Sequence, residues 1–153
     1  MSAGKPTAII LAAGKGTRMK GDLPKVVHPV GDRAMVCAVV DACRAAGGAG
    51  CGRIIAVVGY KQELVREALA EYPEVEFAVQ DQQLGTGHAV LCAEAVFNSA
   101  PASTEVFVLC GDGPLIRADT LKTILKKHRD ARAAATLATA IIDDPAGYGR
   151  IVR

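Results

Sequence analysis

Hydrophobic residues along this chain occur in two alternating patterns: short continuous runs, and longer stretches in which they recur every three or four positions. Short runs rich in β-branched residues predict strands buried in a sheet, and the three-to-four spacing predicts helices with one apolar face. The short runs predict strands at residues 8–12, 53–58, 75–79, 105–109 and 134–141, with a further strand opening at 147–150. The longer stretches predict helices over residues 34–46, 64–72, 88–98 and 121–128.

Strands that alternate with helices at these lengths predict βαβ units, and therefore an α/β fold with a mostly parallel sheet and helices on both faces. Ligands of such sheets bind beyond the carboxyl ends of the strands. Three segments that follow predicted strands carry glycine or polar residues: the loop 14–17, the segment 80–86 and Asp112. We expect these segments to lie together at one edge of the sheet and to form one site.

The loop 14–17, with the sequence GKGT, has the composition of an anion-binding turn. Its glycines let the backbone turn sharply and point successive N–H groups at one anion. We expect a helix to begin after the loop, where its N-terminus would add a partial positive charge. Arg18 and Lys25 place two cations beside the loop, and Pro24 restricts the direction of Lys25. Backbone donors with an arginine and a lysine suit a triphosphate.

Two common phosphate-binding motifs do not fit this loop. A P-loop needs Ser or Thr after its lysine, but Gly16 follows Lys15, and a dinucleotide fingerprint needs a third glycine where this chain has Met19. What remains is the string LAAGKGTRM followed by LPK, which is similar to that of nucleotidyltransferases that join sugar 1-phosphates to nucleoside triphosphates. The simpler alternative is a tight strand-to-helix turn whose charges are solvated.

Two further segments carry side chains suited to a nucleotide. Asp112 ends a predicted buried strand, and a carboxylate there can hold Mg²⁺ together with substrate phosphates. The alternative is that Asp112 only makes a turn, since Asp and Pro favour turns. Gln80 offers an amide, and Gly85 and Thr86 expose backbone, which suits the edge of a pyrimidine. The alternative for these residues is a polar loop over the sheet edge.

Composition excludes several classes of protein. The 153 residues carry a formal net charge of +2, with acidic and basic residues mixed and no basic tail, so we expect no nucleic-acid partner. No apolar run approaches the ~20 residues of a membrane span, so we expect no membrane partner. The five cysteines lack the spacing of a metal site or a disulfide framework. Free cysteines indicate a reducing compartment, and we expect a cytoplasmic protein.

Five motifs occur in the order in which one enzyme family carries them. They are LAAGKGTRM, DLPKV-H, QLGTGHAV, GD-PLI and DDP-GYGRI, and they extend from about Ala8 to the last residue. On these motifs the chain resembles the uridylyltransferase domain of the bifunctional N-acetylglucosamine-1-phosphate uridylyltransferase/glucosamine-1-phosphate acetyltransferase family. The resemblance implies a three-layer, Rossmann-like nucleotidyltransferase fold. It also implies an enzyme that uses Mg²⁺ to form UDP-N-acetylglucosamine and pyrophosphate from UTP and N-acetylglucosamine 1-phosphate.

The resemblance implies roles for individual residues as well. Arg18 and Lys25 would be catalytic, stabilising the charge that develops on the α-phosphate and on the leaving pyrophosphate. Asp112 would be a metal ligand, and Gly149 would contact the sugar nucleotide. The nucleotide-binding positions, which include Lys25, would also be Leu11, Ala12, Ala13, Gly14, Gly16, Thr17, Gln80, Gly85, Thr86, Cys110 and Gly111.

The chain departs from the family pattern at two places. Gly113 stands where the family usually has a larger apolar residue, and the sequence ends at Arg153. The family's domain continues with a glutamate and an asparagine for the acetamido sugar and a second metal ligand, and a β-helical acetyltransferase domain forms its trimer. We therefore expect residues 1–153 to be the nucleotide-binding part of a larger domain, to bind UTP weakly and to make little product alone. The resemblance leaves the oligomeric state open.

Other functions stay open on the sequence. The chain could be a nucleotide-binding module without turnover, or a nucleotidyltransferase that acts on another sugar phosphate or on a cofactor such as molybdopterin. A regulatory, receiver-like α/β domain is the non-enzymatic alternative. It predicts no affinity for a triphosphate and leaves Arg18 and Lys25 unexplained.

Overall fold

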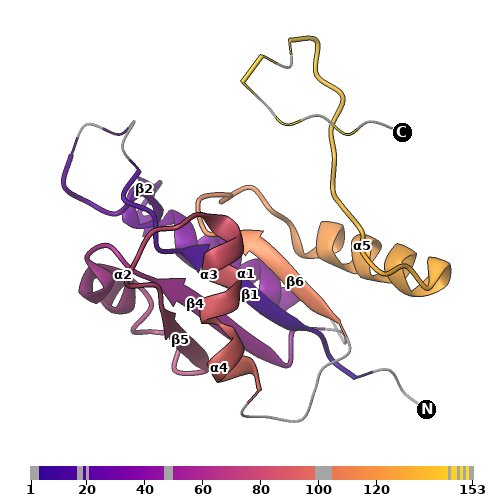
Figure 1. Ribbon diagram of the computed structural model, residues 1–153, viewed down its shortest axis with the longest axis horizontal. Coiled ribbons are helices and arrows are strands. Elements are labelled where there is room, and N and C mark those ends of the chain that lie inside the picture. Colours follow the sequence, from indigo (N-terminus) through magenta and orange to yellow (C-terminus); the bar gives the residue numbers. More distant parts are fainter. Residues whose placement is uncertain are drawn as a thin grey trace. The chain divides into compact units, whose positions relative to one another are not determined.

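A parallel sheet forms the core of one part of the structure, a computed structural model that describes residues 4–16, 19, 21–46, 50–98, 105–144, 146–147, 149 and 151. The chain forms two compact units, Met1–Lys122 and Thr123–Arg153. The sheet belongs to the first unit, and its described strands follow the order β5–β4–β1–β6 (Figure 1). These strands are β1 (Thr7–Ala12), β4 (Arg53–Val58), β5 (Val75–Val79) and β6 (Val106–Cys110).

The register of the strands brings their carboxyl ends to one edge of the sheet. In the parallel ladders Ala12 lies beside Val58, Leu11 lies beside Cys110, and Val58 lies beside Val79. The loops that leave β1, β5 and β6 therefore start at the same level. This is the edge at which parallel sheets bind ligands.

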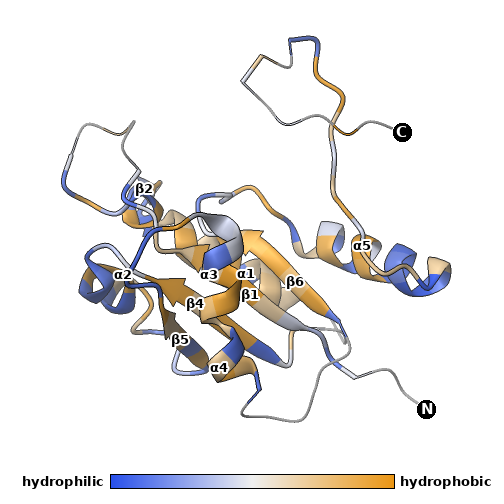
Figure 2. Ribbon diagram, viewed as in Figure 1, coloured by the Kyte–Doolittle hydropathy of each residue, from blue (hydrophilic) through white to orange (hydrophobic). Residues whose placement is uncertain are grey.

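Side chains of β1 and β4 alternate between two apolar layers, so these two central strands are buried on both faces. Ile10 and Ala56 point to the face covered by α1 (Met35–Ala45) and α2 (Gln62–Ala68). Ile9 and Ile55 point to the opposite face, covered by α3 (Thr86–Cys92) and α4 (Glu94–Phe97). Figure 2 shows hydrophobic residues over most of β4 and hydrophilic residues on α2. The predicted α/β fold with helices on both faces is confirmed.

The remaining elements are short, except for one helix. A 3-10 helix, η1 (Lys25–Val27), precedes a small antiparallel hairpin of β2 (Pro29–Val30) and β3 (Arg33–Ala34). The helix α5 (Ala118–Ala131) crosses the boundary between the two units, and its first turn contributes Leu121 to the core of the first unit. Among the described residues, no helix is both long and apolar enough to cross a membrane. All five cysteines are free.

The prediction of a strand at residues 134–141 is wrong. Residues 135–142 form neither helix nor strand, and Leu137 and Ile141 are 70% and 104% exposed. An apolar β-branched run becomes a strand only when another strand takes up its backbone hydrogen bonds, and none in the described part of the chain pairs with it. The strand expected at 147–150 is not formed at Gly147 and Gly149, and Tyr148 and Arg150 lie outside the described residues.

Two features between β1 and α1 differ from expectation. No helix follows the glycine loop among the described residues, which continue as bends to Pro24 and then form η1. Two prolines close together disfavour an α-helix there, because the residue before each proline is pushed out of the α region. The hairpin of β2 and β3 was not predicted, since strands of two residues are too short to produce a periodic signal.

Candidate active site

A cavity of about 360 Å³ opens within the first unit, at the carboxyl edge of the sheet. Its volume lies in the usual range for small-molecule sites. The cavity is lined by Leu11, Ala13, Gly14, Gly16, Lys25, Val26, Gln80, Gln83, Gly85, Thr86, Ala89, Cys110 and Asp112. Its walls therefore come from all three segments that the sequence predicts to meet at this edge.

The charged wall of the cavity is an ion pair between Lys25 and Asp112. Lys25 begins η1, Asp112 follows β6, and their side chains are 40% and 30% exposed. Gly16 makes the position of Lys25 possible: its φ is +73°, and a Cβ there would lie 2.6 Å from the Cβ of Lys25. The glycine loop and Lys25 are therefore in direct contact, because Gly16 has no side chain.

Gly111 holds the end of β6 against the end of β1. Its N–H donates to the carbonyl of Leu11 at 2.9 Å, and an added Cβ would lie 2.9 Å from the same oxygen. Any side chain at this position would push the two strand ends apart. Asp112, the next residue, thereby leaves the sheet directly beside the loop that follows β1.

The segment after β5 forms the opposite wall. Gln80 is 4% exposed, and its backbone N–H donates to the carbonyl of Val58 at 2.8 Å, which extends the β4–β5 ladder. Its side-chain Nε2 donates to the carbonyl of Gly85 at 3.0 Å and lies 3.0 Å from Nδ1 of His88. Gln83 donates from Nε2 to the carbonyl of Ala13 at 2.9 Å. This last bond joins the segment to the glycine loop across 70 positions of sequence.

Most of the predicted site residues line this cavity. Thr17 and Arg18 lie outside the described residues, and Gly149 belongs to the second unit. Ala12 and Gly111 are buried and do not line the cavity. The predicted residues that do line it are Leu11, Ala13, Gly14, Gly16, Lys25, Gln80, Gly85, Thr86, Cys110 and Asp112. What each of them binds stays a prediction.

Sequence reasoning missed Gln83, Val26 and Ala89 as lining residues. Val26 and Ala89 are small or medium apolar residues, which carry no signal that separates a cavity wall from a core position. Gln83 lies inside a segment already singled out, but its partner is a backbone carbonyl at the far side of the site. Such a contact leaves no local trace in the sequence.

The carboxylate of Asp112 suits a divalent ion that arrives with phosphates. Among the described residues, no three His, Cys, Asp or Glu side chains come together as a metal-binding group. Mg²⁺ does not need such a group, because it keeps several waters and is commonly held by one or two carboxylates and substrate phosphates. The donor set therefore fits a metal shared with a nucleotide and does not fit one held by protein alone.

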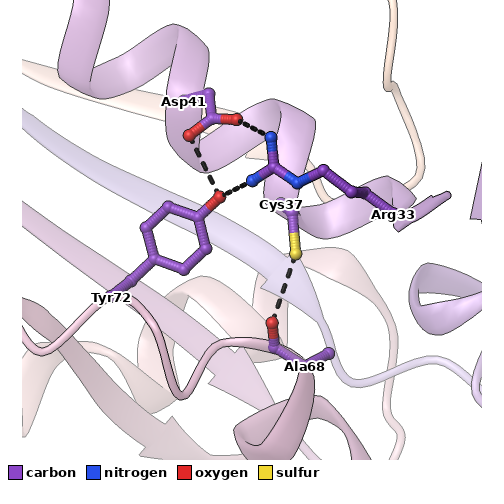
Figure 3. A network of polar contacts seen from close by, with 5 residues as sticks. All are labelled: Arg33, Cys37, Asp41, Ala68 and Tyr72. Carbon is purple, nitrogen blue, oxygen red and sulfur yellow. Dashed lines mark hydrogen bonds and ion pairs between the residues drawn. The ribbon is translucent and has the colours of Figure 1, made fainter.

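A second polar network ties the helical layer together and includes no residue of the cavity (Figure 3). Arg33 donates to Asp41 at 2.8 Å and to the hydroxyl of Tyr72, and that hydroxyl donates to Asp41 at 3.0 Å. Burial, with the neighbouring Asp41, raises the pKa of Tyr72 to about 12. Cys37 donates its thiol hydrogen to the carbonyl of Ala68 at 3.2 Å, and burial raises its pKa. These contacts join β3, α1 and α2.

The chain matches curated proteins over nearly its whole length. It is 47% identical over 150 residues to the bifunctional protein GlmU of Geobacter metallireducens, and 50% identical over 145 residues to GlmU of Carboxydothermus hydrogenoformans. These alignments cover 98% and 95% of this chain but only 30% of each relative. The chain thus spans less than a third of the length of the curated relatives it matches.

Solved structures have the same fold. Rv0371c from Mycobacterium tuberculosis H37Rv is 28% identical, with a TM-score of 0.67 over 82% of this chain and 61% of that one. A structure of Rv0371c in complex with manganese aligns at 25% identity, with a TM-score of 0.61 over 80% of this chain and 59% of that one.

The model of one family covers the sheet, the cavity and the segments that surround it. It describes a MobA-like NTP transferase domain and matches residues 8–150. The glycine loop, the segment after β5 and Asp112 all lie within that match. With relatives 47–50% identical over the same residues, the chain belongs to the family of MobA-like NTP transferase domains.

Proposed function

We propose that this chain forms the nucleotide site of a sugar-1-phosphate uridylyltransferase, which makes UDP-N-acetylglucosamine and pyrophosphate from UTP and N-acetylglucosamine 1-phosphate. One observation carries the proposal: residues predicted from three separated motifs to bind one nucleotide line one cavity. The relatives named GlmU support the same assignment. Residues 1–153 would then be the nucleotide-binding part of a nucleotidyltransferase domain.

In this reaction an oxygen of the sugar phosphate attacks the α-phosphorus of UTP. The new bond joins that oxygen to phosphorus, and the bond between the α-phosphorus and the bridging oxygen breaks, so that pyrophosphate leaves. No side chain needs to form a covalent intermediate. The protein contributes mainly by positioning the two phosphates and by stabilising the negative charge that develops on them.

The residues of the cavity divide this work. Backbone N–H groups of the loop at Gly14 and Gly16 would hold the triphosphate, and Lys25 would stabilise charge on the α-phosphate and on the leaving pyrophosphate. Arg18 stays a proposed second cation. Gln80, Gly85 and Thr86 would contact the base, whereas Cys110 would lie beside the ribose.

Asp112 would hold a divalent ion, which when bound neutralises phosphate charge. The manganese complex of Rv0371c supports a divalent ion in this fold, and we propose Mg²⁺ for this chain. The metal would compete with Lys25 for the carboxylate, because the two side chains form an ion pair in the structure. Free cysteines support a reducing, cytoplasmic setting, and UTP and a sugar 1-phosphate are the proposed small-molecule partners.

Nucleotide binding tests this proposal. With Mg²⁺ present, titration calorimetry of this 153-residue chain should show heat on addition of UTP and much weaker binding of ATP and GTP. A site shaped for one pyrimidine ring excludes a purine by steric clash. Equal binding of UTP, ATP and GTP would contradict the assignment of Gln80, Gly85 and Thr86 to the base. Binding of none of them would contradict the nucleotide site itself.

Pyrophosphate release from UTP and N-acetylglucosamine 1-phosphate tests the sugar specificity separately. It is measured on a protein that carries the whole nucleotidyltransferase domain, because residues 1–153 alone are expected to make little product. Comparable release with several unrelated sugar 1-phosphates would contradict N-acetylglucosamine 1-phosphate as the acceptor. Tight UTP binding with no release for any sugar phosphate would favour a nucleotide-binding module without turnover.

A further inference from the structure

The side-chain amide of Gln80 has a defined orientation. Its Nε2 lies 3.0 Å from the carbonyl oxygen of Gly85, and a carbonyl oxygen can only accept a hydrogen bond. The atom beside Gly85 must therefore be the amide nitrogen. The same nitrogen lies 3.0 Å from Nδ1 of His88 and has no lone pair to offer, so Nδ1 is the acceptor.

This arrangement also defines the tautomer of His88. A neutral imidazole has one donor and one acceptor nitrogen, so an accepting Nδ1 puts the ring hydrogen on Nε2. Sγ of Cys92, one helical turn further along α3, lies 3.8 Å from Nε2 and 3.9 Å from Nδ1, so the tautomer is set by the Gln80 contact alone. Both hydrogens of the Gln80 amide are thus used inside the protein, one by backbone and one by imidazole.

The carbonyl end of the amide is left for a ligand. Gln80 is 4% exposed and lines the cavity, and within the described part of the chain its Oε1 has no hydrogen-bond partner. A nearly buried carbonyl that loses water without gaining a donor destabilises the complex. A base that fits this wall must therefore present an N–H group to Oε1.

The two common pyrimidines differ at this point. Uracil carries a hydrogen on its N3 and presents a donor there, whereas cytosine N3 carries only a lone pair and would face the lone pairs of Oε1. For a base whose N3 faces Oε1, the orientation of this one amide therefore separates uracil from cytosine, whose own donor, the N4 amino group, lies beside that position. A protein that lets the amide turn over could satisfy either base.

We propose that His88 is a positioning residue which, together with the Gly85 carbonyl, holds the Gln80 amide so that the base site accepts uracil and rejects cytosine. The inference rests on the proposed function, because it takes the base of a nucleotide to lie against Gln80. The residues that make these contacts are close in sequence: Gln80 follows β5, Gly85 precedes α3, and His88 lies in the first turn of α3.

Three variants of the full 153-residue chain test His88. His88→Leu keeps an apolar side chain of moderate size but removes the acceptor, and His88→Asn replaces Nδ1 by an amide oxygen that can still accept. Leu91→Ala is the matched control, since Leu91 lies on the same helix and is 65% exposed. Calorimetric titration with UTP and with CTP, in the presence of Mg²⁺, measures the ratio of the two dissociation constants for each variant.

We expect the unmodified chain, His88→Asn and Leu91→Ala to share one preference for UTP over CTP. In His88→Leu the ratio should fall about tenfold, the usual size of one unmet hydrogen bond. If His88→Leu weakens the binding of UTP and of CTP equally and leaves the ratio of dissociation constants unchanged, His88 has only a structural role and the inference is overturned. Loss of the preference for UTP over CTP in His88→Asn would also overturn the inference.

The ¹⁵N chemical shifts of His88 give a second, nucleotide-free readout. At neutral pH they should show a bare Nδ1 and a protonated Nε2. A protonated Nδ1 would overturn the inference whatever the nucleotide data show. Failure of the unmodified chain to bind UTP, with the expected tautomer present, would instead contradict the proposed function and leave the orientation of Gln80 supported.

Discussion

Lys25 and Asp112 illustrate how single residues shape the site. Each is the other's ion-pair partner, so the cation that suits a phosphate is neutralised by the carboxylate that suits a metal. A magnesium nucleotide supplies both missing partners at once: phosphate oxygens for Lys25 and a divalent ion for Asp112. The nucleotide alone supplies only phosphates, which the carboxylate repels.

Asp112→Asn should therefore have opposite effects with and without Mg²⁺. Without the metal, removal of the carboxylate frees Lys25 and removes a repulsion, so UTP should bind more tightly than it binds to the unmodified chain. With Mg²⁺, the variant loses the metal's protein ligand and should bind UTP more weakly. Calorimetric dissociation constants in Mg²⁺ and in EDTA measure both effects, and the same sign in both buffers would contradict the metal role of Asp112.

Lys25→Ala should weaken the binding of UTP both in Mg²⁺ and in EDTA. A hydrogen bond to a charged group contributes roughly 1.5–3 kcal/mol, which corresponds to roughly a tenfold to hundredfold increase in the dissociation constant. Lys122→Ala is the control, because Lys122 lies on α5, pairs with Asp119 and does not line the cavity. Normal UTP affinity in Lys25→Ala would remove this lysine from the site.

At the scale of elements, Arg53 ties three pieces of secondary structure together. Its guanidinium donates to both carboxylate oxygens of Glu76 at 2.7 Å, which links the first residue of β4 to β5. It also donates to the carbonyls of Val96 and Phe97 at 2.9 and 3.0 Å. These carbonyls belong to the last two residues of α4. One side chain thus holds α4 against the start of two strands.

The hydrogen bonds of Arg53 lower the pKa of Glu76, and a pH-dependent contribution to stability follows. A carboxyl whose pKa is lower in the folded chain stabilises the fold above its ordinary value of ~4.3, and this stabilisation is lost as pH falls through the folded value. We expect Glu76→Gln to lower the free energy of unfolding at pH 7 by less than about 1 kcal/mol, since the carboxylate is partly solvated.

Urea unfolding at pH 7 and at pH 3, followed by circular dichroism, measures this contribution. The difference between Glu76→Gln and the unmodified chain should shrink at pH 3, because this pH lies below the ordinary pKa of glutamate and the stabilisation falls with pH from there. Glu67→Gln, at an exposed position of α2, controls for the loss of any one carboxylate. A difference that is as large at pH 3 as at pH 7 would contradict the ion-pair explanation.

At the scale of the whole molecule, the cavity exists only when distant segments meet. Gly16, Lys25, Gln80 and Asp112 are brought together by the order β5–β4–β1–β6, which places the chain's first strand between later ones. The unfolded chain has no such site. Ligand binding is therefore linked to folding, and a ligand that binds only the native state raises the free energy of unfolding.

Mg²⁺ and UTP together should accordingly raise the melting temperature of this chain. At a UTP concentration about a hundred times the dissociation constant, the gain is about 2.7 kcal/mol, or roughly 5–10 °C for a chain of this size. Thermal scans with and without nucleotide measure the shift. Lys25→Ala should show a much smaller shift at the same UTP concentration, and an equal shift in both proteins would place UTP at another site.

Much of the fold and of the site could be predicted from local sequence. The strands at 53–58 and 75–79 occur with the predicted bounds. The first is covered on both faces and therefore reads as a nearly continuous apolar run. The strand at 105–109 is shifted by one residue, and the helix at 88–98 is divided into α3 and α4. Parallel βαβ topology then brings the predicted loops to one edge, which is why separate motifs could be assigned to one cavity.

Only the tertiary structure decided which strands form and which side chains contact each other, because both depend on residues far away in the sequence. The run 134–141 has the composition of a strand but no partner in the described chain, and a strand cannot satisfy its backbone alone. The ion pair of Lys25 with Asp112 and the bond from Gln83 to Ala13 join residues far apart in sequence, and so leave no periodic signal. Periodicity reports which face of an element is apolar. Which residue lies opposite that face is determined only when the sheet has formed.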